Sequence, residues 1–289
     1  IPSNLFKELE LKSSNEPHFR LLNSSGTSGQ RLSKIYLDKE NVNNQIKVLS
    51  KLFTTTFGNE RLPMLIIGES NDNKNEKLNA KNAAIRGFSI FAKKQVFAEH
   101  YNGKINYPLI NKFLNQYGDS KFLVFGFTAD VYNFFIKKLN FKKLKKNFIN
   151  AFILHGGGWK KMEEKKIDNN IFKDHLKKKL KINNIYNYYG VVEQTGSIFI
   201  ECKCGKLITS VFSDILIRNE RLEVVAKNKK GLVQLLSLLP TSYPGQSILT
   251  EDIGEIIDNN GCKKCDIKGK TFKIHGRSKN SEVRGCSNI

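Results

Sequence analysis

Short, continuously apolar segments alternate with segments of helical spacing over the first two thirds of the chain. The apolar segments, which predict buried strands, lie at 62–67, 121–127, 149–154 and 185–189, and 88–97 is strand-like. The segments whose apolar residues recur at helical spacing lie at 39–57, 109–117, 129–139 and 168–181. Such alternation predicts an α/β fold, in which parallel sheet layers are covered by helices.

The pattern changes near residue 196. Short strands separated by turn residues are predicted at 198–201, 215–218, 222–226 and 231–238. We therefore predict an α/β domain at 1–196 and a smaller β-rich, barrel-like subdomain at 197–289.

The chain is strongly basic, with 48 Lys and Arg against 27 Asp and Glu and a net charge of +21. This balance indicates either an anionic partner or a composition biased toward lysine and asparagine. The densest lysines, at 137–181, lie on predicted amphipathic helices, which is typical of a solvated face. No nucleic-acid module is recognisable, so we expect no specific nucleic-acid partner.

The most apolar stretch, 122–136, is interrupted by Asp130, so no membrane span is expected. The first ten residues lack the basic start and apolar core of a signal peptide. A cytoplasmic location with reduced cysteines is the prediction.

Hydroxyl groups and glycines are concentrated in one short loop near the N-terminus. Backbone N–H groups in such a loop can cradle phosphate oxygens, although a flexible Ser/Gly turn is the alternative. The loop residues are Ser24, Ser25, Gly26, Thr27, Ser28 and Gly29.

Two further motifs follow predicted strands, where α/β sheets bind ligands. Gly156, Gly157 and Gly158 form the first, and a tight turn is its alternative. In the second, YYGVVEQTG, Glu193 is a candidate Mg²⁺ ligand or an ordinary surface carboxylate. The sequences TEDIGE at 250–255 and HGRSK at 275–279 come later in the chain.

In this order, the motifs resemble those of the adenylate-forming (ANL) ligase superfamily. The sequence is most similar to its LuxE-like acyl-protein synthetases, which are related to phenylacetate–CoA ligase. The similar segments include SSGTSGQRLSKIYLD, LHGGGWKKM, YGVVEQTGSIF, LLPTSYPGQSILTEDIG and HGRSKNSEVRGCS. The resemblance implies that the chain is the large N-terminal part of such a ligase, ending at the hinge motif with the C-terminal lid domain absent or vestigial. Relative to that family, the start is expected to be short by several tens of residues.

The resemblance also implies a role for each motif. The loop at 24–29 would hold the β- and γ-phosphates of ATP, and the glycines at 156–158 would line the adenine and acid pockets. Tyr189 and Gly190 would lie near the adenine.

Three charged residues complete the implied nucleotide site. Glu193 would bind Mg²⁺, Asp252 would accept hydrogen bonds from the ribose hydroxyls, and Arg277 would contact ribose or phosphate. Two positions depart from the family pattern: Val192 replaces a threonine, and Glu251 replaces a glycine.

The implied activity is ATP-dependent conversion of a carboxylic acid, by default a fatty acid, to an acyl-adenylate. The acyl group would then pass to Cys286 as a thioester, for a partner acyl reductase or acyl-transferase. Arg284 would favour the Cys286 thiolate. The alternatives are an acyl-CoA ligase of the phenylacetate–CoA ligase type, which would not need Cys286, and a degenerate, non-catalytic subunit.

Four cysteines outside this site form two close pairs. They are Cys202 and Cys204, as C-x-C, and Cys262 and Cys265, as C-x-x-C. Thiolates in two close pairs are typical of a structural Zn²⁺ site, and two pairs of ordinary reduced thiols are the alternative.

Overall fold

A computed structural model describes residues 1–13, 18–24, 31–69, 80–159 and 167–278. The chain forms two compact units. The first unit comprises residues 1–56, 78–83 and 188–289, and the second comprises 57–77 and 84–187. The N-terminal segment therefore groups with the C-terminal strands. The domain boundary at residue 196 stays a prediction.

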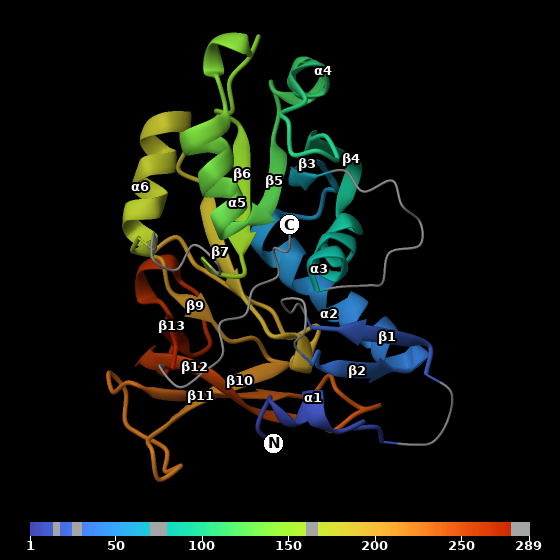
Figure 1. Cartoon of the computed structure of the whole chain (residues 1–289). Helices are drawn as coiled ribbons and strands as arrows, with labels where there is room; N and C mark the ends of the chain where they lie inside the picture. The colour runs from blue at the N-terminus through green and yellow to red at the C-terminus, as the bar shows by residue number, and fades with distance from the viewer. Residues whose placement is uncertain (14–17, 25–30, 70–79, 160–166, 279–289) are drawn as a thin grey trace. The chain divides into compact units, whose positions relative to one another are not determined.

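The second unit is built on a sheet in the order β4-β3-β5-β6-β7 (Figure 1). Its strands are β3 (Leu62–Glu69), β4 (Ala92–Glu99), β5 (Phe122–Phe127), β6 (Ala151–Gly156) and β7 (Ile185–Tyr189). The pairs β3–β4, β3–β5 and β5–β6 are parallel, which confirms the predicted parallel sheet. From Tyr188 onward, β7 belongs to the first unit.

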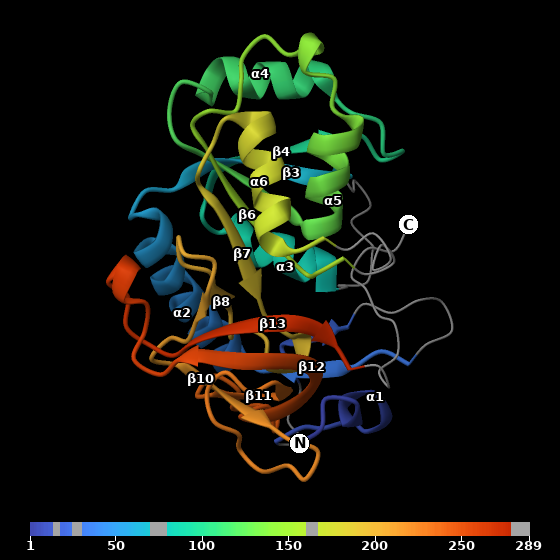
Figure 2. The same ribbon diagram turned by 90° about the vertical axis from the view of Figure 1, so that its left-hand side faces the viewer.

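Helices cover this sheet because its strands are apolar on both faces. The helical elements are α3 (Ala80–Ser89), α4 (Tyr107–Tyr117), α5 (Thr128–Tyr132), the π-helix η1 (Asn133–Lys138), the 3₁₀ turn η2 (Phe141–Lys143) and α6 (Asn169–Leu180). One face packs against α4, α5, η1 and α6 in a single apolar cluster, and α5 and α6 lie in front of the strands in Figure 2. On the other face, Phe88 stacks near Phe125 at 4.8 Å, and Phe57 lies 6.3 Å from Phe152, between ring centroids.

Some predicted boundaries shift for local reasons. The segment predicted as a strand from residue 88 is still helical through Ser89, and the strand begins at Ala92. The helix predicted at 129–139 begins one residue earlier, at Thr128, whose hydroxyl lies 3.0 Å from His155 Nδ1 and donates to the Gly156 carbonyl at 3.1 Å. The helix at 168–181 is confirmed, because Asp168 accepts a capping hydrogen bond from the Asn170 amide at 2.8 Å.

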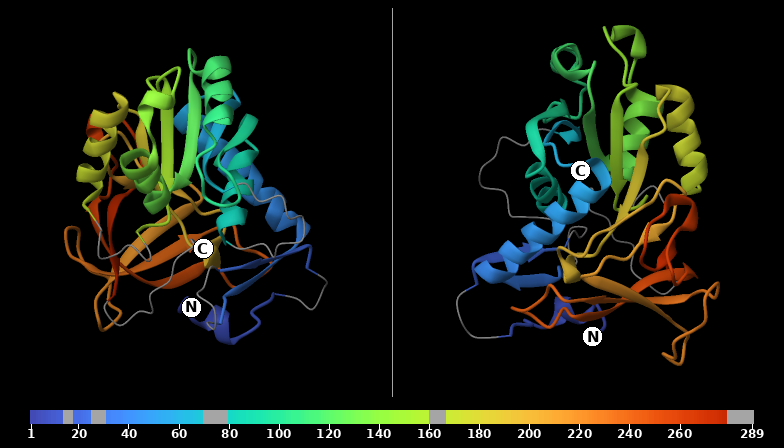
Figure 3. Two further views of the ribbon diagram at one scale, coloured as in Figure 1. Left: turned by 45° about the horizontal axis from the view of Figure 1, so that its top comes forward. Right: turned by 180° about the vertical axis from the view of Figure 1, so that it is seen from behind.

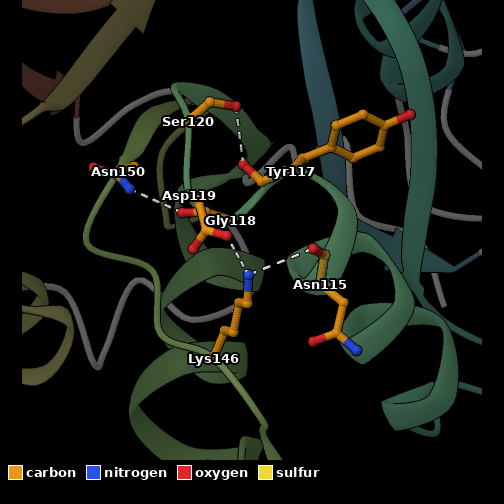
Figure 4. Close-up of polar contacts among 7 residues, drawn as sticks. All are labelled: Asn115, Tyr117, Gly118, Asp119, Ser120, Lys146 and Asn150. Carbon is orange, nitrogen blue, oxygen red and sulfur yellow. Dashed lines mark hydrogen bonds and ion pairs between the residues drawn. The ribbon is translucent and has the colours of Figure 1, made fainter.

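The C-terminal end of α4 is tied to the segment before β6 (Figure 4). Lys146 donates to the carboxylate of Asp119 and to the Asn115 carbonyl, the latter at 3.5 Å. Asn150 Nδ2 donates to the Gly118 carbonyl at 2.9 Å. This lysine of the dense 137–181 region thus joins two structural elements within the unit.

The first unit begins with α1 (Leu5–Glu8), a hairpin of β1 (Arg20–Asn23) and β2 (Lys34–Leu37), and α2 (Lys39–Phe57). These elements are drawn in blue in Figure 3. The two strands of the hairpin are antiparallel. The helix α2 was predicted to begin after Asp38, and the Asp38 carboxylate accepts a hydrogen bond from the Asn41 amide at 2.6 Å.

The same unit contains an antiparallel sheet in the order β10-β11-β12-β13-β9. Its strands are β9 (Leu207–Ile208), β10 (Ser213–Arg218), β11 (Gly231–Ser237), β12 (Ser247–Asp258) and β13 (Thr271–Arg277). The short strand β8 (Phe199–Ile200) pairs with Tyr188 and Tyr189. The predicted β-rich character is confirmed. The strand predicted at 222–226 is wrong: Leu222 has a φ of 63°, and the segment forms only an isolated bridge from Val224 to Arg218.

Candidate functional site

A buried hydrogen bond joins two motifs that are far apart in the sequence. Ser33 Oγ donates to Glu193 Oε1 at 2.6 Å, and both side chains are buried. The Ser33 amide donates to Ser24 Oγ at 2.8 Å, and the Ser24 amide donates to the Ser33 carbonyl at 2.9 Å. These bonds extend the β1–β2 hairpin and place the residues flanking the Ser/Gly loop beside Glu193.

Glu193 lies on the 3₁₀ turn η4 (Val192–Gln194), which follows β7. The turn is held in place by the side chain of Gln194, whose Nε2 donates to the Gly245 carbonyl at 2.8 Å. Val192 packs on the apolar cluster that contains Leu22 and Ile35, which gives this departure from the family pattern an apolar setting.

Burial raises the pKa of Glu193 above its ordinary value. The hydrogen bond from Ser33 and the positive charge of Arg277 oppose this shift, and the charge of Asp252 adds to it. A buried carboxylate whose anionic form is costly is a suitable oxygen ligand for a cation.

A second group of side chains is centred on Asp252. Tyr189 donates its hydroxyl to Asp252 Oδ2 at 2.6 Å, and Arg277 Nε lies 3.9 Å from Asp252 Oδ1. Asp252 on β12 and Arg277 on β13 are paired across these two strands, which are neighbours in Figure 2. Burial and the adjacent carboxylate raise the pKa of Tyr189 well above its ordinary value, so the hydroxyl remains protonated and donates.

Glu251 gives Arg277 a second anionic neighbour. The guanidinium lies 3.7 Å from Glu251 Oε2, and the Ser278 amide donates to the Glu251 carbonyl at 2.9 Å. A glycine at this position would have no carboxylate to offer, so the departure adds a charge partner for the end of β13.

Close packing also restricts the backbone after β7. At Gly190, a Cβ atom would lie 2.8 Å from Ile198 Cδ1 and 3.1 Å from the Ser197 carbonyl oxygen. A side chain would therefore displace its neighbours, which is a physical reason for glycine here.

The three glycines at 156–158 lie at the end of β6, in the second unit. Gly157 and Gly158 have φ values of 75° and 69°, which L-residues rarely adopt. His155, just before them, is fully buried; its burial, together with the charge of Lys173, lowers its pKa to about 3. The imidazole is therefore neutral and serves as a hydrogen-bonding group. Trp159 belongs to the apolar core.

Several predicted site residues lie outside the described residues. These are Cys286 and, in the phosphate loop, Ser25, Gly26, Thr27, Ser28 and Gly29. Ser33 was missed from the sequence. It lies inside the segment SSGTSGQRLSKIYLD, four residues after the last glycine of the loop (33 − 29 = 4), and the resemblance of that segment was its one signal.

Comparison with known proteins identifies the class. A family model described as acyl-protein synthetase, LuxE, matches residues 1–289. The chain belongs to this acyl-protein synthetase family. A search of curated proteins finds no match.

Solved structures of adenylate-forming ligases share the fold, which confirms the predicted fold class. An open conformation of 2-hydroxyisobutyryl-CoA ligase matches with a TM-score of 0.64 and 12% identity, over 96% of this chain and 60% of that chain. A luciferase-like enzyme from the Zophobas morio mealworm matches at 0.60 and 16%, over 93% and 60%. ATP-bound MatB from Rhodopseudomonas palustris matches at 0.57 and 12%, over 89% and 47%. The chain thus spans about half the length of MatB.

Among the described residues, no helix has the length and apolar character needed to cross a bilayer.

Proposed function

We propose that this chain uses ATP to convert a carboxylic acid to an acyl-adenylate and then transfers the acyl group to a thiol. The observation that supports this most directly lies within the first unit: three predicted site residues, Tyr189, Asp252 and Arg277, come together, and a fourth, Glu193, is oriented by a residue that was not predicted. Ser33 bonds to Glu193 at 2.6 Å, and Tyr189 bonds to Asp252 at 2.6 Å beside Arg277. Membership of the acyl-protein synthetase family supports the same reaction.

In the first step, a carboxylate oxygen of the acid attacks the α-phosphorus of ATP. A new P–O bond forms, the bond to the β-phosphate oxygen breaks, and pyrophosphate leaves with the electron pair. The acid is already ionised and nucleophilic, so the site needs no general base. The protein contributes by aligning the two reactants and neutralising charge on the phosphates.

Each charged residue of the site has a role in this proposal. Asp252, oriented by the Tyr189 hydroxyl, accepts hydrogen bonds from the ribose, and Arg277 contacts ribose or phosphate. Glu193 would hold Mg²⁺, which supplies positive charge to the phosphates when bound. Ser33 fixes the orientation of the Glu193 carboxylate.

In the second step, a thiolate attacks the acyl carbon and AMP leaves with the bonding electron pair. We propose Cys286 as this thiol, a fatty acid as the substrate, and an acyl reductase or acyl-transferase as the partner that takes the thioester. A thioester retains enough reactivity for reduction or a further transfer. We also propose that the reaction takes place in the cytoplasm.

The first test is ATP–pyrophosphate exchange that depends on added carboxylic acid, over a panel of short, long and aromatic acids. We expect exchange with one class of acid and its loss in Arg277→Gln. The matched control is Lys273→Gln, which removes one positive charge from the same strand at an exposed position and should keep the exchange. No exchange with any acid, together with no binding of ATP, would refute the proposal.

The second test separates the acyl acceptors. Cys286→Ser should keep the exchange reaction but lose the protein-bound acyl group that mass analysis detects in the wild type. Acyl transfer to added CoA in both proteins, with no acylated chain, would instead establish an acyl-CoA ligase.

A further inference from the structure

The four paired cysteines lie close together in the first unit, although the two pairs are far apart in the sequence. Cys204 and Cys262 are 58 positions apart (262 − 204 = 58), and Cys202 and Cys265 are 63 positions apart (265 − 202 = 63). Cys202 and Cys204 lie in the connection between β8 and β9, and Cys262 and Cys265 lie between β12 and β13. Their four Sγ atoms all lie within 4.8 Å of one another. We propose that these cysteines bind one structural Zn²⁺ ion.

The spacing of the sulfur atoms fits a single tetrahedral ion. Zinc–thiolate bonds of about 2.3 Å place the four sulfur atoms of a tetrahedron about 3.8 Å apart. Cys265 Sγ lies 3.3 Å from Cys204 Sγ, and all four residues are free thiols. Small movements of the side chains would therefore bring the four sulfur atoms to the distances that zinc requires.

Backbone hydrogen bonds hold both pairs in tight turns. In the first turn, the Cys202 amide donates to the Lys206 carbonyl and the Gly205 amide donates to the Cys202 carbonyl, both at 2.9 Å. In the second, the Cys262 amide donates to the Ile267 carbonyl at 2.8 Å, and the Cys265 amide donates to the Cys262 carbonyl at 3.1 Å. The positions of the ligands are thus largely set before a metal binds.

Glycine is required at the entrance to the second turn. Gly261 has a φ of 109°, and a Cβ atom there would lie 2.1 Å from the Ile267 carbonyl oxygen. The turn that presents Cys262 therefore depends on a backbone approach that only glycine permits.

The charge of the two turns suits the proposed site. One Zn²⁺ with four thiolates carries a net charge of −2. Residues 201–206 and 262–268 carry five lysines against two acidic residues, Glu201 and Asp266. The lysines are Lys203, Lys206, Lys263, Lys264 and Lys268. Nearby positive charge stabilises the thiolate form that binds zinc.

The position of the cluster indicates a structural role. Strand β9 pairs with β13 through only two residue pairs, Thr271↔Ile208 and Phe272↔Leu207. A metal bound just before both strands would fasten this edge of the sheet. Arg277, at the far end of β13, is six residues from Thr271 (277 − 271 = 6), or about 20 Å along an extended strand. The ion would therefore act on stability and not on the reacting atoms.

The experiment measures metal in the full chain, purified without chelator under reducing conditions, by elemental analysis. We expect one zinc per chain. Cys204→Ser and Cys265→Ser should each lose it, whereas Cys286→Ser, which alters a cysteine that is not one of the four proposed ligands, should retain it. Wild-type protein stripped of metal and titrated with Co²⁺ should give the absorption of tetrahedral cobalt–thiolate coordination, which keeps the test valid if the variants fail to fold.

Three results would overturn the inference. They are no zinc in the purified protein and none bound on titration, iron in place of zinc, or a Cys204–Cys265 disulfide under the same reducing conditions. None of these measurements uses ATP or a carboxylic acid, so they test the zinc inference independently of the proposed ligase activity.

Discussion

The bond from Ser33 to Glu193 can be tested by a change of one oxygen atom. Ser33→Ala removes the hydroxyl that donates to the buried carboxylate at 2.6 Å. Hydrogen bonds to charged groups contribute about 1.5–3 kcal/mol, against about 0.5–1.5 kcal/mol for neutral ones. We expect Ser33→Ala to lower the free energy of unfolding by an amount in the higher range when the pH lies above the raised pKa of Glu193, because the carboxylate is then ionised.

The pH dependence gives this prediction its specific sign. The pKa of Glu193 is raised above its ordinary value of 4.5 in the folded protein. Its contribution to stability is therefore fully present below pH 4.5 and is lost as pH rises through the folded pKa. Loss of the Ser33 hydroxyl raises that pKa further, so the variant should lose more stability at pH 8 than at pH 5.

Urea denaturation at both pH values, in buffer without Mg²⁺, measures these changes. The matched control is Ser197→Ala, which removes a buried donor to a neutral partner, the Ser237 hydroxyl, at 2.7 Å. The free energy of unfolding that Ser197→Ala removes should be the same at pH 5 and at pH 8. In a Glu193→Gln background, Ser33→Ala should lower the free energy of unfolding by only about 0.5–1.5 kcal/mol, the range for a hydrogen bond between neutral groups. Equal costs for Ser33→Ala at both pH values and in both backgrounds would refute the reasoning.

Three further substitutions test other parts of the molecule. Tyr189→Phe removes the donor that orients Asp252 and should weaken ATP binding several-fold in calorimetry while the chain stays folded; unchanged affinity would contradict the role of Asp252 in the site. Gly126→Ala places a methyl group 2.8 Å from a valine side chain of α5, and should destabilise the second unit by about 1–3 kcal/mol in urea denaturation. Asp168→Ala removes the side-chain cap of α6 on the Asn170 amide and should cost about 1 kcal/mol, read from thermal unfolding.

The parallel strands and capped helices were predictable because their signals are local. The segments 62–67 and 122–127 are apolar throughout, and a strand buried on both faces explains such a run in a chain with helical segments on either side. Asp38 and Asp168 similarly mark helix starts within four residues of sequence.

The antiparallel strands were harder to predict. The segment at 222–226 has strand-like composition, but Leu222 adopts a left-handed turn, and the neighbouring strand β10 pairs with β11 instead. The hairpin of β1 and β2 and the long strand β12 were not predicted as strands, because their pairing partners are separated from them by polar loops or many residues. Pairing across a sheet is decided by tertiary packing and not by local preference.

The sequence by itself determined the local elements and motifs of this protein. These are buried strands, capped helices, an ordered set of motifs typical of one ligase family, and two cysteine pairs. Only the tertiary structure decided which of these residues meet. It brought Ser33 to Glu193 and Arg277 to Asp252, and gathered four sulfur atoms from two turns. The physical reason is that burial, ion pairing and metal coordination act over distances in space, whereas spacing along the chain reports only neighbours within a few residues.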